Sequence, residues 1–464
     1  MAFNESEVKA QYENYPYPKR DPEHEKVRLI NTPSNQLDRI NHYCFSGNST
    51  FDKDFRVLVA GGGTGDAAIM LAEQLRNTPA EIVYLDMSRS SMQVARERAR
   101  IRGLQNIKWI ESSLLKLPEM DIGGFDYINC SGVLHHLDSP DAGLHALTSV
   151  LKHHGALSVM VYAPYGRTGV YLIQELMRHI NHDISNLQHK VDNTRTVLNT
   201  LQKTNIHGLA AKNRFRIDIE EFGDIGIYDL FLHSQDRAYT VSQLYEFIES
   251  QDLKIIQFFG DLHRNQDGLV LGNQAYNPAA FLKDSSIGET VRKLPLRSQQ
   301  AIAELLHGGY HMHSIYASRQ IPLKPDPGNL DHVPNFTIQW NKSVNIEYER
   351  LAQHSNNQVV MNERGPGGKI NCTITFAKTP NAPRILGLIN GVRTLREIYD
   401  TIQSETTQAV SVEQLSSEFD NIFTSLHMHN RMFLRHQSVP GYQTLEEMQS
   451  RVSSSGNGIP NSTV

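Results

Sequence analysis

The sequence predicts an α/β protein built on a doubly wound, mostly parallel sheet, with a helical insertion and a small α+β unit towards its C-terminal end. Apolar runs and helical patterns alternate from residue 55 to residue 163. The first apolar run ends in a glycine-rich turn, "AGGGTGD", which leads directly into a helical pattern. Because each crossover helix must return the chain to the same edge of the sheet, alternating strands and helices are expected to give parallel strands.

The elements of this region are predicted in chain order. The expected strands are "FRVLVA", "EIVYLD", "NIKWIE", "FDYINC" and "ALSVMVYA". Apolar residues recur at helical spacing after the first strand, in "SMQVARERAR" and again after Pro140. The strands mostly lack alternation of polar and apolar residues, which predicts that both of their faces are buried.

Weaker patterning from 165 to 235 predicts a helical insertion over the ligand-binding end of the sheet. Beyond it, Thr240 and Gln243 form a capping-box pattern, and residues 253–259 and "YHMHSIYAS" predict two more strands. The predicted units are an N-terminal cap or lid at 1–50, a sheet domain at 51–320, a proline-rich linker at 321–335, a helix–helix–strand unit at 336–436 and a disordered tail at 437–464.

Composition limits the classes of function. The chain has 464 residues and a formal net charge of −5, so its overall charge gives no reason to expect nucleic acid as a partner. The cysteines Cys44, Cys130 and Cys372 are far apart, which argues against a disulfide framework and against a metal site. No apolar run approaches the length of a membrane span, so we expect a cytoplasmic protein without membrane contact.

The glycine loop predicts a nucleotide-like ligand. Gly61, Gly63 and Gly65 follow the first strand, where backbone amides and a helix N-terminus favour a ligand with hydrogen-bond acceptors. Asp66 stands where a dinucleotide fingerprint has its last glycine, and its charge would repel a pyrophosphate, which disfavours a nicotinamide dehydrogenase. Asp86 ends the second strand, where its carboxylate can accept both hydroxyls of a ribose or, alternatively, cap the next helix.

Four segments in this order resemble the class I S-adenosylmethionine-dependent methyltransferases: the "GGGTG" loop, "VYLDMS", "IESSLLKLP" and "FDYINCSGVLHHL". Together with "YENYPYP", the loop is similar to a bacterial subgroup that is often fused to tetratricopeptide repeats or other recruiting modules. The resemblance implies a Rossmann-like fold, S-adenosylmethionine as the cofactor, and a tyrosine-rich cap over the cofactor cleft. The residues that it implies at the cofactor are Gly61, Gly63, Gly65, Asp86, Met87, Ser113, Leu114 and Cys130.

The acceptor site is predicted from residues on both sides of the insertion. A base is needed only if the acceptor arrives protonated, although one histidine of "LHHL" is more often structural. The candidate catalytic residues are His136, His135, Asp229 and His233, and the candidate substrate-binding residues are Tyr12, Tyr15, Tyr17 and Arg237. The alternatives are a surface arm for the tyrosines and a solvated loop with an ion pair for residues 229–237.

The C-terminal unit favours a peptide or protein acceptor. Its "ILGLINGVRTLREIYDTI" and "MFLR" resemble winged-helix peptide-recognition domains of the PqqD-like type, which present peptides to modifying enzymes. One alternative is a C- or O-methyltransferase of a quinone or natural product, with the C-terminal unit forming a homodimer. Another is a non-catalytic scaffold, because Val59 and Ser113 stand where the family usually has acids.

Overall fold

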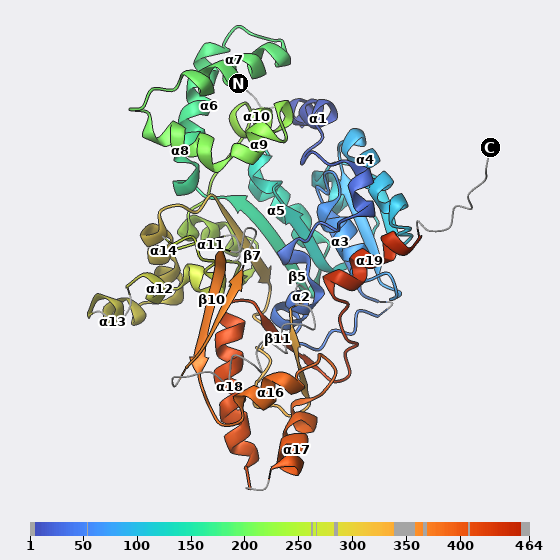
Figure 1. The fold of residues 1–464 in the computed structure, drawn as a ribbon. Coiled ribbons are helices and arrows are strands. Elements are labelled where there is room, and N and C mark those ends of the chain that lie inside the picture. Colours follow the sequence, from blue (N-terminus) through green and yellow to red (C-terminus); the bar gives the residue numbers. More distant parts are fainter. Residues whose placement is uncertain are drawn as a thin grey trace, which may run out of the picture.

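The computed structural model describes residues 5–52, 54–260, 263–265, 267–282, 286–337, 358–364, 369–406 and 409–455. Its centre is a seven-stranded sheet with the strand order β3-β2-β1-β4-β5-β7-β6 (Figure 1). The strands are β1 Arg56–Ala60, β2 Glu81–Asp86, β3 Ile107–Glu111, β4 Phe125–Ser131, β5 Leu151–Tyr162, β6 Lys254–Phe258 and β7 Met312–Ser318. All neighbours pair in parallel except β7, which runs antiparallel to β5 and β6. The predicted doubly wound, mostly parallel sheet is confirmed.

Helices pack on both faces of this sheet. In the sheet domain they are α3 Asp66–Gln74, α4 Arg89–Ile101, α5 Pro140–Ser149, α11 Val241–Glu249, α12 Ala279–Leu282, α13 Ser286–Arg292 and α14 Leu296–His307, with a short 3-10 helix, η6 Gly272–Tyr276. The hydroxyl of Ser88 caps α4, and Thr240 and Gln243 form the predicted capping box of α11. The strand order reverses between β1 and β4, so their carboxyl ends border the crevice in which such sheets bind ligands.

The N-terminal segment wraps around the sheet domain. Helix α1 Glu5–Asn14 lies beside α4 near the carboxyl ends of the strands (Figure 1). Two short 3-10 helices, η1 Pro22–Lys26 and η2 Pro33–Asn35, lead to α2 Leu37–Cys44. Helix α2 packs on one face of the sheet, against β6 and β7. The segment therefore contacts both the ligand end and one face of the domain.

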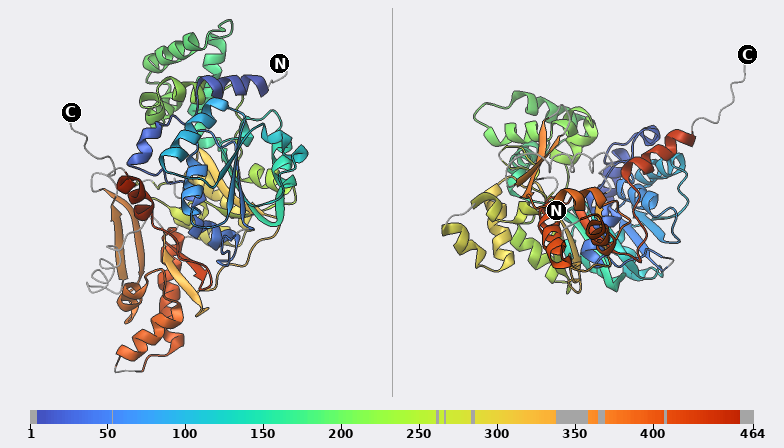
Figure 2. Two further views of the ribbon diagram at one scale, coloured as in Figure 1. Left: turned by 90° about the vertical axis from the view of Figure 1, so that its right-hand side faces the viewer. Right: turned by 60° about the horizontal axis from the view of Figure 1, so that its bottom comes forward.

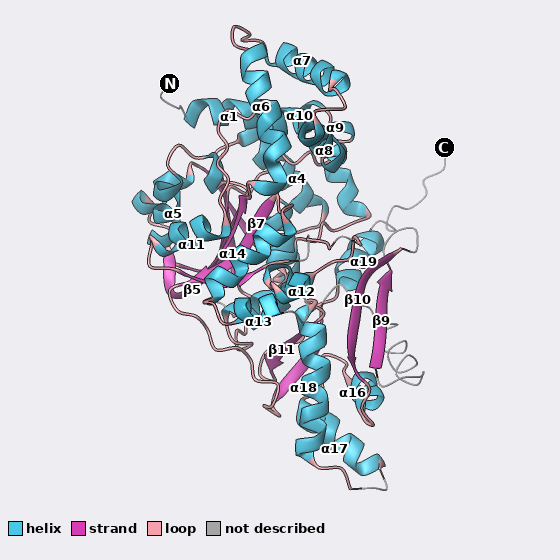
Figure 3. Ribbon diagram, turned by 90° about the vertical axis from the view of Figure 1, so that its left-hand side faces the viewer, coloured by secondary structure: helices cyan, strands magenta, loops and turns pink. Residues whose placement is uncertain are grey.

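Residues 165–235 are helical, and their helices form a separate layer. They are η5 Tyr165–Arg167, α6 Thr168–Ile180, α7 Leu187–Thr200, α8 Ile206–Arg214, α9 Arg216–Glu220 and α10 Asp224–Phe231. Buried apolar side chains of α6, α7, α8 and α10 form a small core of their own. This insertion and the C-terminal unit lie at opposite ends of the molecule in views turned to either side (Figures 2 and 3). None of the described helices has the length and apolar character of a membrane span.

The C-terminal unit begins earlier in the chain than the sequence predicts. Strand β8 His332–Phe336, placed almost entirely in the expected linker, pairs antiparallel with β11 Met432–His436. The other elements are β9 Gln358–Arg364, β10 Ile370–Ala377, α16 Ala382–Leu388, α17 Leu395–Glu405 and α18 Val412–Met428. Met432 and Leu434 belong to the core of this unit, whereas Phe433 packs against α2. Because alternate residues of a strand face opposite sides, β11 joins two cores, and β8 is ordered by this pairing rather than by its own sequence.

The prediction of a disordered tail at 437–464 is wrong for its first part. Helix α19 Leu445–Ser455 packs on the sheet domain: Met448 is fully buried, and Arg451 donates to the carboxylate of Glu73 at 2.8 Å. Thr444 and Glu447 exchange the two hydrogen bonds of a capping box, a signal that the sequence contains as "TLEE". Among the described side chains of α19 only Met448 is buried, and Leu445, one turn before it, is partly buried against the same apolar cluster, so the docked face of this helix is narrow. Residues 456–464 lie outside the described part of the chain.

Candidate functional site

The glycine loop forms a tight turn between β1 and α3. Gly61, Gly63 and Gly65 have φ values of 71°, 50° and 102°, in the left-handed region that favours glycine. A Cβ atom at Gly63 would lie 2.8 Å from the carbonyl oxygen of Tyr17, so the N-terminal segment passes directly over this residue. The loop therefore exposes bare backbone at the crevice between β1 and β4.

Two side chains of β2 hold this loop in place. The carboxylate of Asp86 accepts hydrogen bonds from the amides of Gly63 at 2.7 Å and Ser88 at 2.8 Å. The hydroxyl of Tyr84 donates to the carbonyl oxygen of Gly63 at 2.6 Å. Burial raises the pKa of the Asp86 carboxyl group, although these amide donors act in the opposite direction. Each carboxylate oxygen has a further lone pair, so Asp86 can still accept hydrogen bonds from ribose hydroxyls.

The other predicted cofactor residues lie at the ends of β2, β3 and β4. Met87 is partly buried, and Ser113 caps the 3-10 helix η3 Leu114–Glu119 with its hydroxyl. Leu114 and Cys130 are buried in the main core, and burial raises the pKa of the Cys130 thiol to about 12. Cys130 is therefore a neutral core residue, and contact of either residue with a cofactor stays a prediction.

A second group of side chains gathers where β4 and β5 end. His135 and His136 come from the 3-10 helix η4 Leu134–His136 after β4, and Tyr162 is the last residue of β5. The ring of His135 lies near those of His136 and Tyr162, with centroid distances of 4.1 Å and 3.9 Å. The ring of His233, which follows α10, stacks on His136 at 3.8 Å. The fold thus brings three of the four predicted catalytic residues into one cluster.

Backbone partners determine the protonation of two of these histidines. Nδ1 of His136 lies 2.8 Å from the carbonyl oxygen of Gln235, and because a carbonyl only accepts, Nδ1 carries the proton and Nε2 is the basic nitrogen. Nδ1 of His233 instead accepts from the amide of Gln235 at 3.1 Å. Its Nε2 therefore carries the proton and lies 3.3 Å from the hydroxyl oxygen of Tyr12. Burial lowers the pKa of both rings, so both are neutral near pH 7.

Asp229 is the least satisfied charged group at this end of the sheet. It lies on α10 and is 3% exposed. Within the described part of the chain, neither of its carboxylate oxygens has a hydrogen-bond partner. Burial raises the pKa of its carboxyl group to about 7, although the charge of Arg167 and the nearby hydroxyl of Tyr12 act in the opposite direction. Its charge adds to the effect of burial in raising the pKa of Tyr12, Tyr17 and Tyr162. The carboxylate and these three hydroxyls are therefore close enough to interact.

Arg167 compensates the charge of Asp229 only in part, because its guanidinium group already pairs with Asp236. The two side chains are each 2% exposed and meet at 3.0 Å, and two further side chains of α6 also donate to Asp236. The guanidinium carbon of Arg167 lies 3.5 Å from the ring centroid of Tyr162. This ion pair forms a fixed wall of the cluster and leaves Asp229 without a cation of its own.

The structure places the other predicted substrate-binding residues around this cluster. Tyr12 contacts it directly, as described above. Tyr15 stacks on a tyrosine of α10 at 5.3 Å, and the hydroxyl of Tyr17 donates to Asp218 at 3.3 Å. Arg237 is exposed, and its guanidinium group lies over a neighbouring tyrosine ring at 5.0 Å. Tyr15 is thus not brought together with the histidines. Arg237 meets them only through its backbone amide, which donates to the carbonyl oxygen of His135 at 3.1 Å, whereas Tyr12 contacts them through its side chain.

Comparison with known proteins identifies the domain that carries the glycine loop. Residues 51–221 match a family model that describes a methyltransferase domain. This region is a class I S-adenosylmethionine-dependent methyltransferase domain. The order of its glycine loop, the acid after β2 and the segments after β3 and β4 agrees with that assignment.

Relatives of this methyltransferase domain are known in sequence and in structure. An uncharacterized protein of Synechococcus is 33% identical over 220 residues, which are 47% of this chain and 51% of that protein. A demethylmenaquinone methyltransferase of Thermus thermophilus is 34% identical over 109 residues, or 24% of this chain and 48% of that enzyme. The chain thus spans about half the length of these curated relatives. The structure of PKMT2 from Rickettsia typhi in complex with AdoHcy superimposes on this chain with a TM-score of 0.58 and 14% sequence identity. The matched region is 86% of this chain and 75% of the PKMT2 chain, which shows a shared fold.

The residues of the methyltransferase domain fit S-adenosylmethionine. A glycine loop without side chains allows close approach of a nucleoside, and the remaining lone pairs of Asp86 suit its ribose hydroxyls. Ser113, which follows β3, is partly buried, and its hydroxyl accepts from the amide of Leu115 at 3.3 Å. Asp66, by contrast, is paired with Arg20 and Arg98 and is not a ligand group.

Sequence reasoning missed Tyr162 and Arg167. Tyr162 ends β5, and Arg167 follows five residues later. Ligands of such sheets bind at the carboxyl ends of the strands, so the position of these residues in the sequence could have indicated them. No local pattern could pair Arg167 with Asp236, which lies 69 positions further along the chain.

Proposed function

We propose that the protein transfers the methyl group of S-adenosylmethionine to the nitrogen of an amine that belongs to a peptide or protein. The observation that carries this proposal is the buried, only partly compensated carboxylate of Asp229 among tyrosine side chains. A buried charge without a partner is unfavourable, so this arrangement suits a ligand that brings a positive charge. An ammonium group brings that charge with three hydrogen-bond donors, and aromatic faces attract it as well.

The residues of the cluster have separate tasks in this reaction. When bound, S-adenosylmethionine supplies an electrophilic methyl group and leaves as a neutral thioether. Asp229 binds the ammonium form of the acceptor and takes the proton that frees the nitrogen lone pair, and a pKa of about 7 suits a proton acceptor near neutral pH. The basic Nε2 of His136 is a second proton acceptor, held in place by Gln235 and by the ring of His233. Tyr12 and Tyr162 orient the amine and exclude water.

The C-terminal unit supports a peptide or protein as the carrier of this amine. Helices α17 and α18 and strand β11 follow in the helix–helix–strand order on which the resemblance to peptide-recognition domains rests. This unit and the insertion that carries Asp229 lie at opposite ends of the molecule (Figure 1). An acceptor that contacts both must therefore be long or large, and we propose that the C-terminal unit binds a part of it remote from the methylated nitrogen.

A labelling assay tests the proposal. The protein is incubated with S-adenosylmethionine carrying a radiolabelled methyl group and a lysate of the host, and protein bands and the organic extract are counted separately. We expect label in protein bands and N-methylated residues after hydrolysis, and no transfer by Asp229→Asn, which should still bind S-adenosylhomocysteine. Label on carbon or oxygen of the protein would contradict the amine. Cofactor binding without transfer to any fraction would indicate a scaffold.

A small-molecule acceptor is the second candidate. It is favoured by the 34% identity, over 109 residues, to a protein named as a demethylmenaquinone methyltransferase. In that case Asp229 or His136 would take the proton of a quinol or phenol, and the C-terminal unit would have another task, such as forming a homodimer. The same assay distinguishes this candidate, because the label would be found only in the organic extract.

A further inference from the structure

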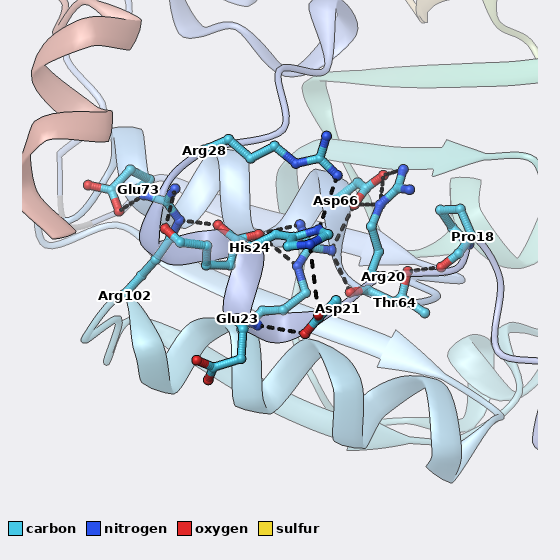
Figure 4. A network of polar contacts seen from close by, with 12 residues as sticks. Pro18, Arg20, Asp21, Glu23, His24, Arg28, Thr64, Asp66, Glu73 and Arg102 are labelled. Atoms are coloured by element: carbon cyan, nitrogen blue, oxygen red, sulfur yellow. Dashed lines mark hydrogen bonds and ion pairs between the residues drawn. The ribbon is translucent and has the colours of Figure 1, made fainter. Parts of the chain in front are cut away.

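Asp66 has a role that cofactor binding does not explain. It is the first residue of α3, directly after the glycine loop, yet two guanidinium groups occupy its carboxylate (Figure 4). Arg98 donates to it from α4 at 2.7 Å, and Arg20 donates through two nitrogens at 2.9 Å and 2.6 Å. Burial would raise the pKa of Asp66, but these two cations hold it below its usual value. Asp66 is therefore a charged anchor for the N-terminal segment.

Residues 12–20, which we call the strap, contact the cofactor side of the crevice at further points. The hydroxyl of Thr64, inside the glycine loop, donates to the carbonyl oxygen of Pro18 at 2.7 Å (Figure 4). The carboxylate of Glu13 accepts from the amides of Arg89 at 2.6 Å and Ser90 at 3.1 Å, at the N-terminus of α4. The strap is thus fixed at both ends, on either side of the residues expected to hold the nucleoside.

The same strap contacts the acceptor side of the crevice. The hydroxyl of Tyr12 lies 3.3 Å from Nε2 of His233, and that of Tyr17 donates to Asp218 of the insertion at 3.3 Å. The guanidinium carbon of Arg20 lies 5.8 Å from the ring centroid of Phe222, also in the insertion. Arg20 therefore joins the glycine loop to the helical layer that carries Asp229.

We infer that the strap couples the two sites, so that cofactor binding orders the acceptor site, with Glu13 and Arg20 as positioning residues. The inference rests on the proposed function, because it takes the cluster around Asp229 as the acceptor site. One short piece of backbone makes both sets of contacts, so a ligand that stabilises the glycine loop in this geometry also stabilises Tyr12 and Tyr17 against the insertion. By linkage, the acceptor then binds more tightly to the cofactor-bound form, and the cofactor binds more tightly to the acceptor-bound form by the same factor.

Hydrogen exchange measured by mass spectrometry tests this coupling without knowledge of the acceptor. S-adenosylhomocysteine is added to the full chain, and exchange is followed at 61–66 and 86–90, at the strap, and at 216–237 of the insertion. In the wild type we expect slower exchange in all of these segments, by about tenfold at 216–237. In Arg20→Ala and Glu13→Ala the protection of 61–66 and 86–90 persists, while that of 216–237 is lost. Arg20→Ala leaves Asp66 paired with Arg98, so the loop keeps its charge balance.

Two matched variants serve as controls. Arg28→Ala and Glu23→Ala remove the same side chains from exposed positions just beyond the strap, and both should respond to S-adenosylhomocysteine like the wild type. Protection of 61–66 without any change at 216–237 in the wild type would overturn the coupling and leave the methyltransferase assignment intact. Full protection of 216–237 in both Arg20→Ala and Glu13→Ala would also overturn it. No protection anywhere would instead contradict the cofactor site itself.

Discussion

Replacing Asp229 by asparagine should change the stability of the protein by an amount that becomes more favourable to the variant as pH rises. A carboxyl group whose pKa rises from 3.8 to about 7 on folding loses stability as pH increases, because the folded state holds on to a proton that the unfolded state has released. This cost is absent below pH 4, about 1.5 kcal/mol at pH 5 and about 4 kcal/mol at pH 8. Asparagine has nearly the same shape and cannot ionise, so it removes the cost.

The comparison between two pH values isolates this effect. The buried amide that Asp229→Asn introduces has unsatisfied donors that cost about 1–3 kcal/mol, but this cost is the same at pH 5 and pH 8. The difference in unfolding free energy between Asp229→Asn and the wild type should therefore be about 2.5 kcal/mol more favourable to the variant at pH 8 than at pH 5. Urea unfolding followed by circular dichroism measures it, with Asp121→Asn as an exposed control that should show no such difference. Equal differences at both pH values would refute the buried, only partly compensated carboxylate.

Asp229→Asn should lower the rate of methyl transfer, whatever its effect on stability. With Asp229 as the proton acceptor, methyl transfer by the wild type should rise as pH increases through about 7, as the carboxyl group loses its proton. Asp229→Asn should lose this rise together with most of the activity while keeping its affinity for S-adenosylhomocysteine. A variant with wild-type activity and an unchanged pH profile would assign the proton to His136 or to none of these residues.

Three further predictions concern the cofactor loop and the C-terminal helix. Asp86→Ala should weaken binding of S-adenosylhomocysteine by about 1–3 kcal/mol in calorimetry, and unchanged affinity would contradict its contact with the ribose. Gly62→Ala would place a Cβ atom 2.2 Å from a ring carbon of Tyr84 and should weaken binding at least about tenfold, whereas Gly441→Ala, at a position without a positive φ, meets no atom closer than 3.8 Å and should bind normally. Met448→Ala empties a fully buried site and should weaken the docking of α19 by about 2–3 kcal/mol, seen as faster proteolysis at 445–455; equal rates would show that Met448 contributes little to the docking.

Features that depend on neighbouring residues were accessible from the sequence. The strands from β1 to β5 are rich in apolar residues, although β3 has only partly buried and exposed positions, and the glycine loop follows directly after the first strand. A local pattern was therefore enough to predict the sheet and the loop. The capping box at Thr240 likewise involves residues three positions apart, and it forms as predicted.

Features that depend on distant partners were not accessible in this way. Strand β8 is ordered by β11, about a hundred positions further along the chain, and α19 is held on the sheet domain by Met448, by Leu445 beside it and by an ion pair to Glu73. The composition of a polar segment with few apolar residues does not show whether such a partner exists. The sequence therefore predicts a linker where β8 forms and a disordered tail where α19 forms.

The proposed acceptor site shows most clearly the difference between features that depend on neighbouring residues and features that depend on distant partners. The sequence by itself determined that a methyltransferase sheet with a nucleoside loop would form, and it supplied Asp229, His136 and Tyr12 as separate candidates. Only the tertiary structure decided that Tyr12 meets His233 across 221 positions, and that Arg167 is taken by Asp236 while Asp229 is left without a cation. The reason is physical: strand and turn formation follow from local geometry, whereas the charge balance of a buried group depends on which distant side chains the fold brings beside it.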